Sequence, residues 1–162
     1  MDRGAIRNSD NVDLRVVVDS DLEFFFIHQS DEEANRLIGF APRNREDFKT
    51  HWAKVLSDDD IVKQTIVAGG EVAGDIVCFL QSGEREVEYW LGREFWGRGI
   101  ATKALAAFLV QVPERPLFAH VAKHNYASHR VLEKCGFVVV GEERSISEVT
   151  NEVVEDWVVR VD

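Results

Sequence analysis

The segment from Glu86 to Val110 constrains the fold more than any other part of the chain. It begins with alternating β-forming residues up to Leu91, passes through a turn with glycines at positions 97 and 99, and ends with apolar residues at helical spacing. Glycine has no Cβ, so the backbone of such a turn can approach a ligand closely. The first N–H groups of a helix lack intrahelical partners and carry partial positive charge. This order of strand, turn and helix therefore predicts an anion site, above all for phosphate.

The elements around this segment predict an α/β domain. The patterns indicate strands at 12–18, 62–68, 71–80, 86–91, 117–122, 138–142 and 152–161, and helices at 22–38 (with a break at 30–31), 45–56, 100–110 and 125–134. Hairpins make antiparallel neighbours, and a strand–helix–strand crossover makes parallel ones. We therefore expect one three-layer domain over residues 12–162, with a mixed twisted sheet of about seven strands and helices on both faces. Residues 1–11 are polar and aperiodic, which predicts a flexible terminus.

Charge and composition narrow the class of partner. The 162 residues carry a formal net charge of −10, which argues against general nucleic-acid binding. An acidic surface suits a cationic or amine-bearing partner, although it also simply favours solubility. Cys78 and Cys135 have no metal-ligand spacing, so we expect two ordinary thiols, no metal and a reducing compartment. Without a membrane-length apolar run or a signal-peptide pattern, the expected location is the cytoplasm, with no membrane partner.

Other phosphate-binding motifs do not match the glycine turn. A dinucleotide fingerprint needs a third glycine where this chain has Thr102, and no acidic residue closes the strand at 117–122. The Gly-Lys-Ser/Thr end of a Walker loop is missing too. On these residues alone, a tight turn whose glycines serve only packing stays an open alternative.

Two segments taken together resemble the GNAT superfamily of acyl-CoA-dependent N-acyltransferases. The run Trp96-Gly97-Arg98-Gly99-Ile100-Ala101 occupies the place of that family's Arg/Gln-x-x-Gly-x-Gly/Ala signature, with Trp96 departing from the usual first residue. The run from Asn125 to Phe137 (NYASHRVLEKCGF) corresponds to the Asn-x-x-Ser…Leu-Glu-Lys-x-Gly-Phe segment of the branch that includes ribosomal-protein N-terminal alanine acetyltransferases. The resemblance covers about Val12 to Val161.

The resemblance implies acetyl-CoA, or another acyl-CoA, as co-substrate. It also implies a splay between the fourth and fifth strands, which would free backbone of Trp90 and Leu91 for the pantetheine arm. Asn125 would hold the pantetheine or the thiol end, while a helix N-cap is its structural alternative. Trp96 is expected to be a packing anchor under the turn. The pyrophosphate is expected to bind backbone amides of the turn and helix start, namely those of Arg98, Gly99, Ile100, Ala101 and Thr102. The side chain of Arg98 is expected to add a charge-assisted contact.

The resemblance further implies that an amine attacks the thioester directly in a ternary complex, so no nucleophilic cysteine is needed. Candidate bases are Glu88 and His120, each acting through water. Many relatives use a tyrosine as the acid for the leaving thiolate, but that position is Leu132 here, and Ser128 becomes the preferred candidate. The alternatives are a solvated strand face for Glu88, a core or edge role for His120, and a surface hydroxyl for Ser128.

The acceptor is expected to be a primary amine of a peptide N-terminus or a small molecule. Deprotonating an α-amino group at pH 7 costs about 1 kcal/mol, whereas a lysine costs roughly 4–5 kcal/mol. Plausible wall residues are Phe24, Phe25, His28 and Trp52, with ordinary core packing as the alternative. The competing hypothesis is a module that senses acyl-CoA without turnover. We expect a monomer or a homodimer.

Overall fold

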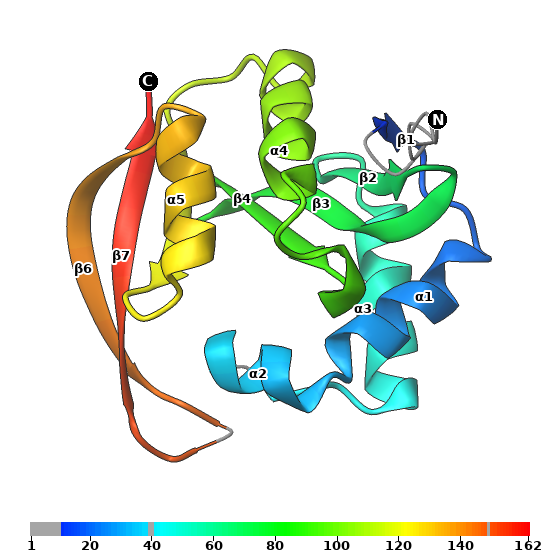
Figure 1. The fold of residues 1–162 in the computed structure, drawn as a ribbon, viewed down its shortest axis with the longest axis horizontal. Helices are drawn as coiled ribbons and strands as arrows, with labels where there is room; N and C mark the ends of the chain where they lie inside the picture. Colours follow the sequence, from blue (N-terminus) through cyan, green and yellow to red (C-terminus); the bar gives the residue numbers. More distant parts are fainter. Residues whose placement is uncertain (1–10, 39–40, 149) are drawn as a thin grey trace, which may run out of the picture.

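The computed structural model describes residues 11–38, 41–148 and 150–162, and residues 1–10 of the predicted flexible terminus lie outside this range. Within it, seven strands form one mixed sheet in the order β1-β2-β3-β4-β5-β7-β6 (Figure 1). All neighbours are antiparallel except β4 and β5. The elements are β1 (Val12–Arg15), α1 (Asp21–Gln29), α2 (Glu32–Ile38), α3 (Arg45–Ser57), β2 (Val62–Ala68), β3 (Glu71–Gln81), β4 (Glu84–Leu91), the 3₁₀ helix η2 (Arg93–Phe95), α4 (Ile100–Gln111), β5 (Leu117–Ala122), α5 (Tyr126–Lys134), β6 (Val138–Ile146) and β7 (Val153–Val161). The predicted α/β domain with a mixed sheet of about seven strands is confirmed.

The first strand is shorter than predicted, because its end turns towards a buried carboxylate. Asp21 is 1% exposed and accepts hydrogen bonds from both terminal nitrogens of Arg15 (2.7 and 2.8 Å), the Val18 N–H (3.0 Å) and the Thr65 hydroxyl (2.7 Å). Burial opposes ionisation of Asp21, but these donors outweigh it and lower its pKa. The chain therefore leaves the sheet after Arg15 instead of continuing to Val18.

Of two further boundaries, one agrees with the prediction and one differs from it. The expected helix over 22–38 is two helices, α1 and α2, separated at Ser30–Asp31 where the break was expected. The strand predicted at 138–142 continues to Ile146, although its second half is charged. Pairing with β7 explains the extension, since Arg144 lies opposite Glu155 and the two side chains form an ion pair at 3.0 Å.

Each face of the sheet carries its own apolar core. One core packs beneath α4 and α5 and includes Ile76, Val87, Leu105, Phe108 and Leu132. The other packs α1 and α3 against the opposite face. Its buried members are Val17, Phe25, Phe48, Trp52 and Val55. The helices thus lie on both faces, as the three-layer prediction required.

The pairing between β4 and β5 is short, and this shapes the site. Only Arg85 with Leu117 and Glu86 with Phe118 pair across the two strands within the described residues. Beyond these pairs β4 continues to Leu91 and β5 to Ala122 without further pairing between the two described strands. The predicted splay between the fourth and fifth strands is therefore present.

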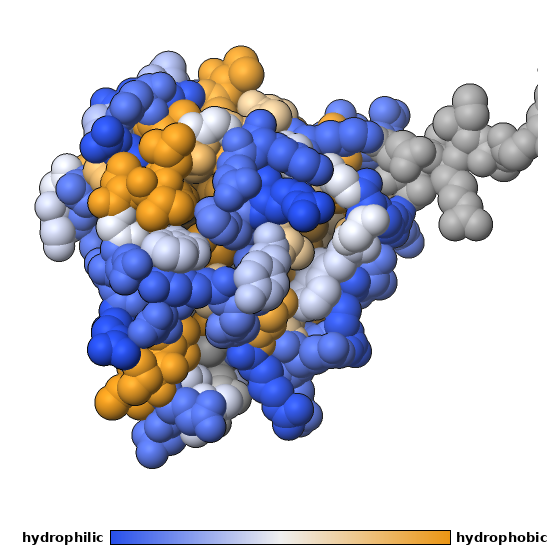
Figure 2. Space-filling view, turned by 60° about the vertical axis from the view of Figure 1, so that its left-hand side comes forward, coloured by the Kyte–Doolittle hydropathy of each residue, from blue (hydrophilic) through white to orange (hydrophobic). Residues whose placement is uncertain are grey.

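The surface on the β6 side is mostly hydrophilic, with separate hydrophobic patches (Figure 2). Exposed apolar residues on the β6–β7 hairpin are Val138, Val139, Val140, Ile146 and Val153. Among the described helices, none combines the length and apolar character needed to cross a membrane.

Candidate active site

A cavity of about 650 Å³ opens on the α4–α5 side of the sheet, and we call it the turn cavity. The end of β4, the glycine turn, the start of α4 and one side of α5 line it. Its lining residues are Leu37, Ile38, Tyr89, Trp90, Leu91, Phe95, Trp96, Gly97, Gly99, Ile100, Ala101, Thr102, Asn125, Tyr126, Ala127, Ser128, Arg130, Val131 and Lys134.

The glycine turn has the backbone geometry that an anion site requires. Gly97 and Gly99 adopt left-handed conformations with φ of 71° and 75°, which side chains with a Cβ rarely tolerate. A Cβ built on either glycine meets no atom of the described residues within 4 Å, so the turn leaves open space on this side. Gly99 is the N-cap of α4, and Ile100 to Thr102 form its first turn along the cavity wall. This open cradle at a helix N-terminus fits a phosphate-bearing ligand.

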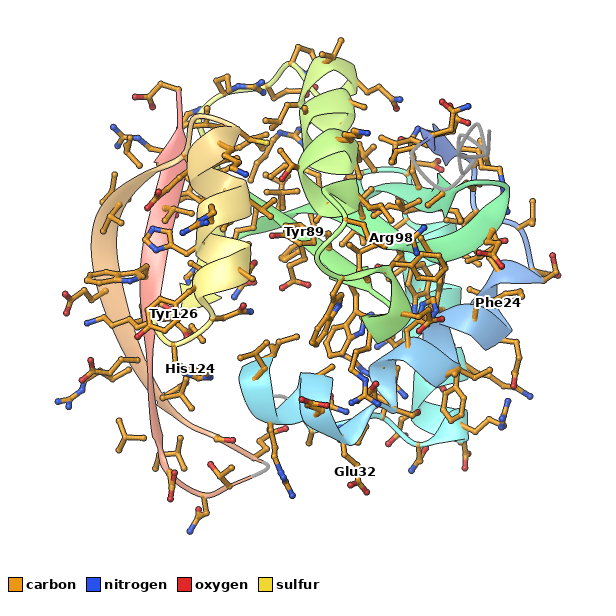
Figure 3. All side chains as sticks on the ribbon, in the orientation of Figure 1. Phe24, Glu32, Tyr89, Arg98, His124 and Tyr126 are labelled. Carbon is orange, nitrogen blue, oxygen red and sulfur yellow. The ribbon has the colours of Figure 1, made fainter. Side chains whose placement is uncertain are left out.

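The charged residues in the wall of the turn cavity are both cations. Arg130 and Lys134 lie one helical turn apart on α5, and neither side chain makes a hydrogen bond or ion pair with another described residue. Arg98, the predicted side-chain contact, does not line this cavity. Its guanidinium lies 5.5 Å from the Phe95 ring centre and donates to the Glu94 carbonyl at 3.3 Å (Figure 3). The i, i+4 spacing of Arg130 and Lys134 was a sequence signal that the motif comparison left unused.

Two indole groups fix the end of β4. The Trp96 N–H donates to the Leu91 carbonyl at 3.0 Å, and the Trp90 N–H donates to the His28 carbonyl at 3.2 Å. Trp96 packs against the core beneath the turn, in keeping with an anchoring role. One lone pair of the Leu91 carbonyl is therefore already used, while the side of β4 that faces β5 lacks a strand partner beyond Glu86.

A second cavity, of about 630 Å³, lies on the opposite face beneath α1 and α3, and we call it the acidic cavity. Its charged wall residues are Arg43, Asp58, Asp60, Asp75 and Glu88, and its aromatic wall includes Phe25, Phe48 and Trp52. Two residues expected in this wall lie elsewhere. Phe24 is 48% exposed and points outward (Figure 3), and the buried His28 ring packs beneath Gly92.

Glu88 and Asp75 project from adjacent strands into the acidic cavity. Glu88 is cross-strand to Val77 and Asp75 to Trp90, which places both carboxyl groups on one face of the sheet. Desolvation by the surrounding protein and, to a smaller extent, the charge of Glu88 together raise the pKa of Asp75 to about 7. The pKa of Glu88 is also raised, by desolvation first and then by the charge of Glu86, although the residue is exposed on the cavity side. Sequence reasoning missed Asp75, because nothing before the β3–β4 register identifies it as a neighbour of Glu88.

His120 lies beside the same cavity but holds two carboxylates. Its Nε2 is 3.0 Å from Glu86 Oε1 and its Nδ1 is 3.0 Å from Glu143 Oε2. Both contacts are hydrogen bonds only when each ring nitrogen carries a proton. Both ring nitrogens of His120 therefore face carboxylates of the protein itself.

The turn cavity and the acidic cavity meet at the splay. Residues common to both linings are Ile38, Tyr89, Trp90, Asn125 and Ser128. Asn125 caps α5 by accepting the Ser128 N–H at 3.2 Å, and no described residue accepts from its amide nitrogen. Ser128 Oγ lies 2.7 Å from the Tyr89 hydroxyl. The structure therefore brings the predicted Asn125 and Ser128 together and adds Tyr89, which the sequence reasoning treated only as a strand residue.

Helix α2 borders the open side of this junction. Arg93 of η2 forms an ion pair with Asp31 at 3.0 Å and a second with Glu33. At the other end of the helix, His124 Nε2 contacts the Leu37 carbonyl at 2.5 Å. These contacts connect α2 to both the β4 side and the β5 side of the splay, so its last residues form part of the turn-cavity wall.

Comparisons with known proteins agree with this architecture. A family model described as an acetyltransferase (GNAT) domain matches residues 11–138, whereas no protein of curated function matches the sequence. An N-acetyltransferase from Staphylococcus aureus Mu50 is 18% identical with a TM-score of 0.80, over 94% of this chain and 98% of that one. Spermidine N-acetyltransferase from Vibrio cholerae, solved with CoA and spermine, is 16% identical with a TM-score of 0.80, over 93% and 94%.

A third solved structure is the microcin C7 self-immunity acetyltransferase MccE with acetyl-CoA and AMP. It is 16% identical with a TM-score of 0.77, over 98% of this chain and 96% of that one. At these identities the solved structures show a shared fold, and the family model shows the family. The chain belongs to the GNAT acetyltransferase family.

Proposed function

We propose that this protein is an N-acetyltransferase that moves an acetyl group from acetyl-CoA to a primary amine by direct attack in a ternary complex. One observation carries the proposal: two cavities of opposite wall charge share five residues at the splay. A cationic wall suits the phosphates of acetyl-CoA, and an acidic wall suits a protonated amine. Their junction is the place where donor and acceptor would meet.

The turn cavity would hold acetyl-CoA through residues of this chain. Backbone amides from Arg98 to Thr102 would bind the pyrophosphate, and Arg130 and Lys134 would add charge. Backbone near Trp90 and Leu91 would pair with the pantetheine arm, and the amide nitrogen of Asn125 would donate to it. When bound, acetyl-CoA supplies an activated acetyl thioester.

The acidic cavity would orient and deprotonate the amine. Glu88 is the preferred base, because its carboxylate opens onto the cavity while both nitrogens of His120 are engaged. The raised pKa of Glu88 brings it closer to neutrality, which suits a general base. Asp75 would share the positive charge of the incoming ammonium group. His120 would act indirectly, by holding Glu86 beside Glu88.

The acceptor would be the amine of a peptide N-terminus or of a small molecule. Four acids against one arginine in the acidic cavity support a cationic acceptor, and a structural neighbour is named for its action on spermidine. A cytoplasmic location, a monomeric or homodimeric state, and the absence of nucleic-acid and membrane partners stay predictions from the sequence.

The second candidate is a domain that senses acyl-CoA without turnover. Leu132, at the position where many relatives place a catalytic tyrosine, is 2% exposed in the core and offers no hydroxyl. This observation favours binding alone, whereas Ser128 at the junction favours transfer.

A thiol-release assay separates the two candidates. Acetyl-CoA is incubated with amines that include Ala- and Ser-initiated peptides, polyamines and aminoglycosides, and free thiol is followed with a chromogenic disulfide. We expect release above the hydrolysis rate with at least one amine, and its loss in Glu88→Gln. CoA that stabilises the fold against heat, combined with no release on the whole panel, would support the sensor.

A further inference from the structure

Two hydroxyl groups meet where the turn cavity and the acidic cavity join. Tyr89 comes from β4 and Ser128 from the first turn of α5, and their oxygens lie 2.7 Å apart. Both residues line both cavities. Figure 3 shows Tyr89 pointing from β4 into the space beside α5. The pair therefore lies at the opening through which an acceptor would reach a bound thioester.

The chemistry of the two groups sets the direction of their hydrogen bond. Either oxygen could donate across the 2.7 Å contact, and the Tyr89 hydroxyl also lies 3.5 Å from the Ser128 carbonyl oxygen, which is a long hydrogen bond. A phenol is a stronger acid than an aliphatic alcohol, which favours Tyr89 as the donor and Ser128 Oγ as the acceptor. Burial raises the pKa of Tyr89 to about 12, so the phenol keeps its proton at neutral pH. The described residues give Ser128 Oγ no other hydrogen-bond partner. Its own proton is then left to point into the cavities.

We propose that Tyr89 is a positioning residue, which holds Ser128 in one orientation and polarises it so that its hydroxyl donates a hydrogen bond to the sulfur of CoA. This inference rests on the proposed function. Where many relatives have a tyrosine on the helix, this chain has Leu132 on α5. Tyr89 brings a phenol to the same junction from β4 instead. The other tyrosine, Tyr126, is 78% exposed, and its hydroxyl forms no hydrogen bond with Ser128 within the described part of the chain.

Acetyl transfer to the amine needs no proton from the hydroxyl of Tyr89 or of Ser128. The nitrogen of the neutral amine forms a bond to the thioester carbon, and the carbon–sulfur bond breaks with its electron pair on sulfur. The proton that leaves nitrogen goes to the Glu88 carboxylate and then to water. Ser128 stabilises the charge on sulfur by hydrogen bonding, and Tyr89 strengthens Ser128 as a donor because hydrogen bonds in a chain polarise one another. CoA thiolate then takes a proton from solvent.

The test compares binding of CoA with binding of desulfo-CoA, which lacks the sulfur. Calorimetry at about pH 9.5, above the ordinary thiol pKa of about 8.5, measures both affinities for wild type, Tyr89→Phe and Ser128→Ala. We expect wild type to prefer CoA, and both variants to lose about five- to tenfold of that preference. Loss of packing at Tyr89 would weaken both ligands equally and leave the ratio unchanged. Tyr126→Phe removes the other phenol without touching Ser128 and is expected to keep the wild-type ratio.

Kinetics give a second, separate measurement. In Tyr89→Phe we expect kcat to fall about tenfold while KM for acetyl-CoA changes less than about twofold. Equal losses of CoA and desulfo-CoA affinity in Tyr89→Phe, or an unchanged ratio in both variants, would overturn the inference. A wild-type protein that prefers CoA yet releases no thiol with any amine would instead overturn the proposed function and leave the hydrogen bond to sulfur standing. Thermal unfolding of each variant confirms that the fold is intact.

Discussion

Arg98 and Arg130 carry the same charge in different surroundings, so replacing them separates two sources of anion binding. The Arg130 side chain lines the turn cavity, whereas the Arg98 side chain lies over Phe95. We expect Arg130→Ala to weaken CoA binding about tenfold at low salt, because it removes a charge-assisted contact to phosphate. The same change at Arg98 should cost less than about threefold.

Titration calorimetry at two salt concentrations measures this difference. The affinity loss in Arg130→Ala should shrink as salt screens the interaction. A larger loss of CoA affinity in Arg98→Ala than in Arg130→Ala would mean that the Arg98 side chain, and not Arg130, contacts the phosphates of CoA. Lys134→Ala, one helical turn further along α5, tests whether the charge is shared.

Gly99 and Gly83 form a matched pair for the role of the turn. Both have positive φ, 75° and 82°, and a Cβ on either meets nothing within 4 Å. Valine at either position should therefore destabilise the fold by a similar amount, about 1–2 kcal/mol. Gly99→Val should also weaken CoA binding on the order of 100-fold, because the side chain fills the cradle. Gly83→Val, in the β3–β4 turn, should leave CoA affinity unchanged.

Thermal unfolding and CoA titration of both variants decide the point. Unchanged CoA affinity in Gly99→Val would sink the assignment of the pyrophosphate to this turn. An equal loss of affinity in both variants would mean that general destabilisation, and not the cradle, explains the effect.

Among single residues, the sequence predicted as site candidates those that belong to local motifs, and it did not identify those that only tertiary contacts bring to the site. Asn125 and Ser128 were found because helix capping and the family motif are both local in sequence. Asp75 was not singled out because its closeness to Glu88 depends on strand register, which is a tertiary property. Tyr89 was not singled out because its contact with Ser128 depends on how α5 packs beside β4. The cations of α5 were missed for a related reason, since only packing decides which helix side borders the cavity.

Among the elements, β3 and β4 approach each other closely at Gly74. A Cβ on this residue would lie 1.9 Å from the Trp90 carbonyl oxygen, a distance that no real side chain maintains. We expect Gly74→Ala to force the end of β4 away and to destabilise the protein by about 2–3 kcal/mol. The midpoint of thermal unfolding should fall by roughly 5–10 °C.

The control is another glycine within a strand of the same sheet. A Cβ on Gly141 of β6 would lie 3.8 Å from Val158 Cβ, an ordinary contact. Gly141→Ala should shift the midpoint by no more than about 2 °C. Equal shifts in the two variants would show that strand glycines matter for flexibility and not for the approach at Trp90.

The elements themselves were largely predictable, and their ends were not. Apolar periodicity located α3 and α4 to within a residue, because a packed helix repeats its buried positions over several turns. The ends of β1 and β6 depend on partners elsewhere in the chain, namely Asp21 for the first and β7 for the second. The short η2 helix has no periodicity long enough to detect.

For the whole molecule, Asp75 should make stability depend on pH. Its pKa is raised from 3.8 to about 7 in the folded state, so folding retains a proton that the unfolded chain releases. Stability from this group is complete below about pH 4 and is lost as pH rises towards 7. Asp75→Asn keeps a neutral side chain at every pH. We expect it to match wild type near pH 4 and to be more stable by about 1–2 kcal/mol near pH 8, allowing for water in the cavity.

Thermal unfolding across this pH range measures the difference between the two proteins. Asp13→Asn, at an exposed position of β1, controls for the loss of one negative charge from an acidic chain. A difference that stays constant from about pH 4 to pH 8 would show that Asp75 ionises normally.

Only two pairs of described residues join β4 to β5, so the sheet consists of two parts, β1–β4 and β5–β7, connected by a short junction. Few hydrogen bonds join the two parts at this junction, so a ligand bound there would add contacts to both and stabilise their arrangement. Glu88–Leu91 pairs with β3 and Ala119–Ala122 with β7 on the sides away from the junction. Amide hydrogen exchange should therefore be faster for the amides of these segments that face the junction than for those bonded to β3 or β7. Saturating CoA should slow exchange at this junction more than elsewhere. Uniform slowing across all strands would mean that the sheet opens as a single unit and that CoA does not specifically stabilise the β4–β5 junction.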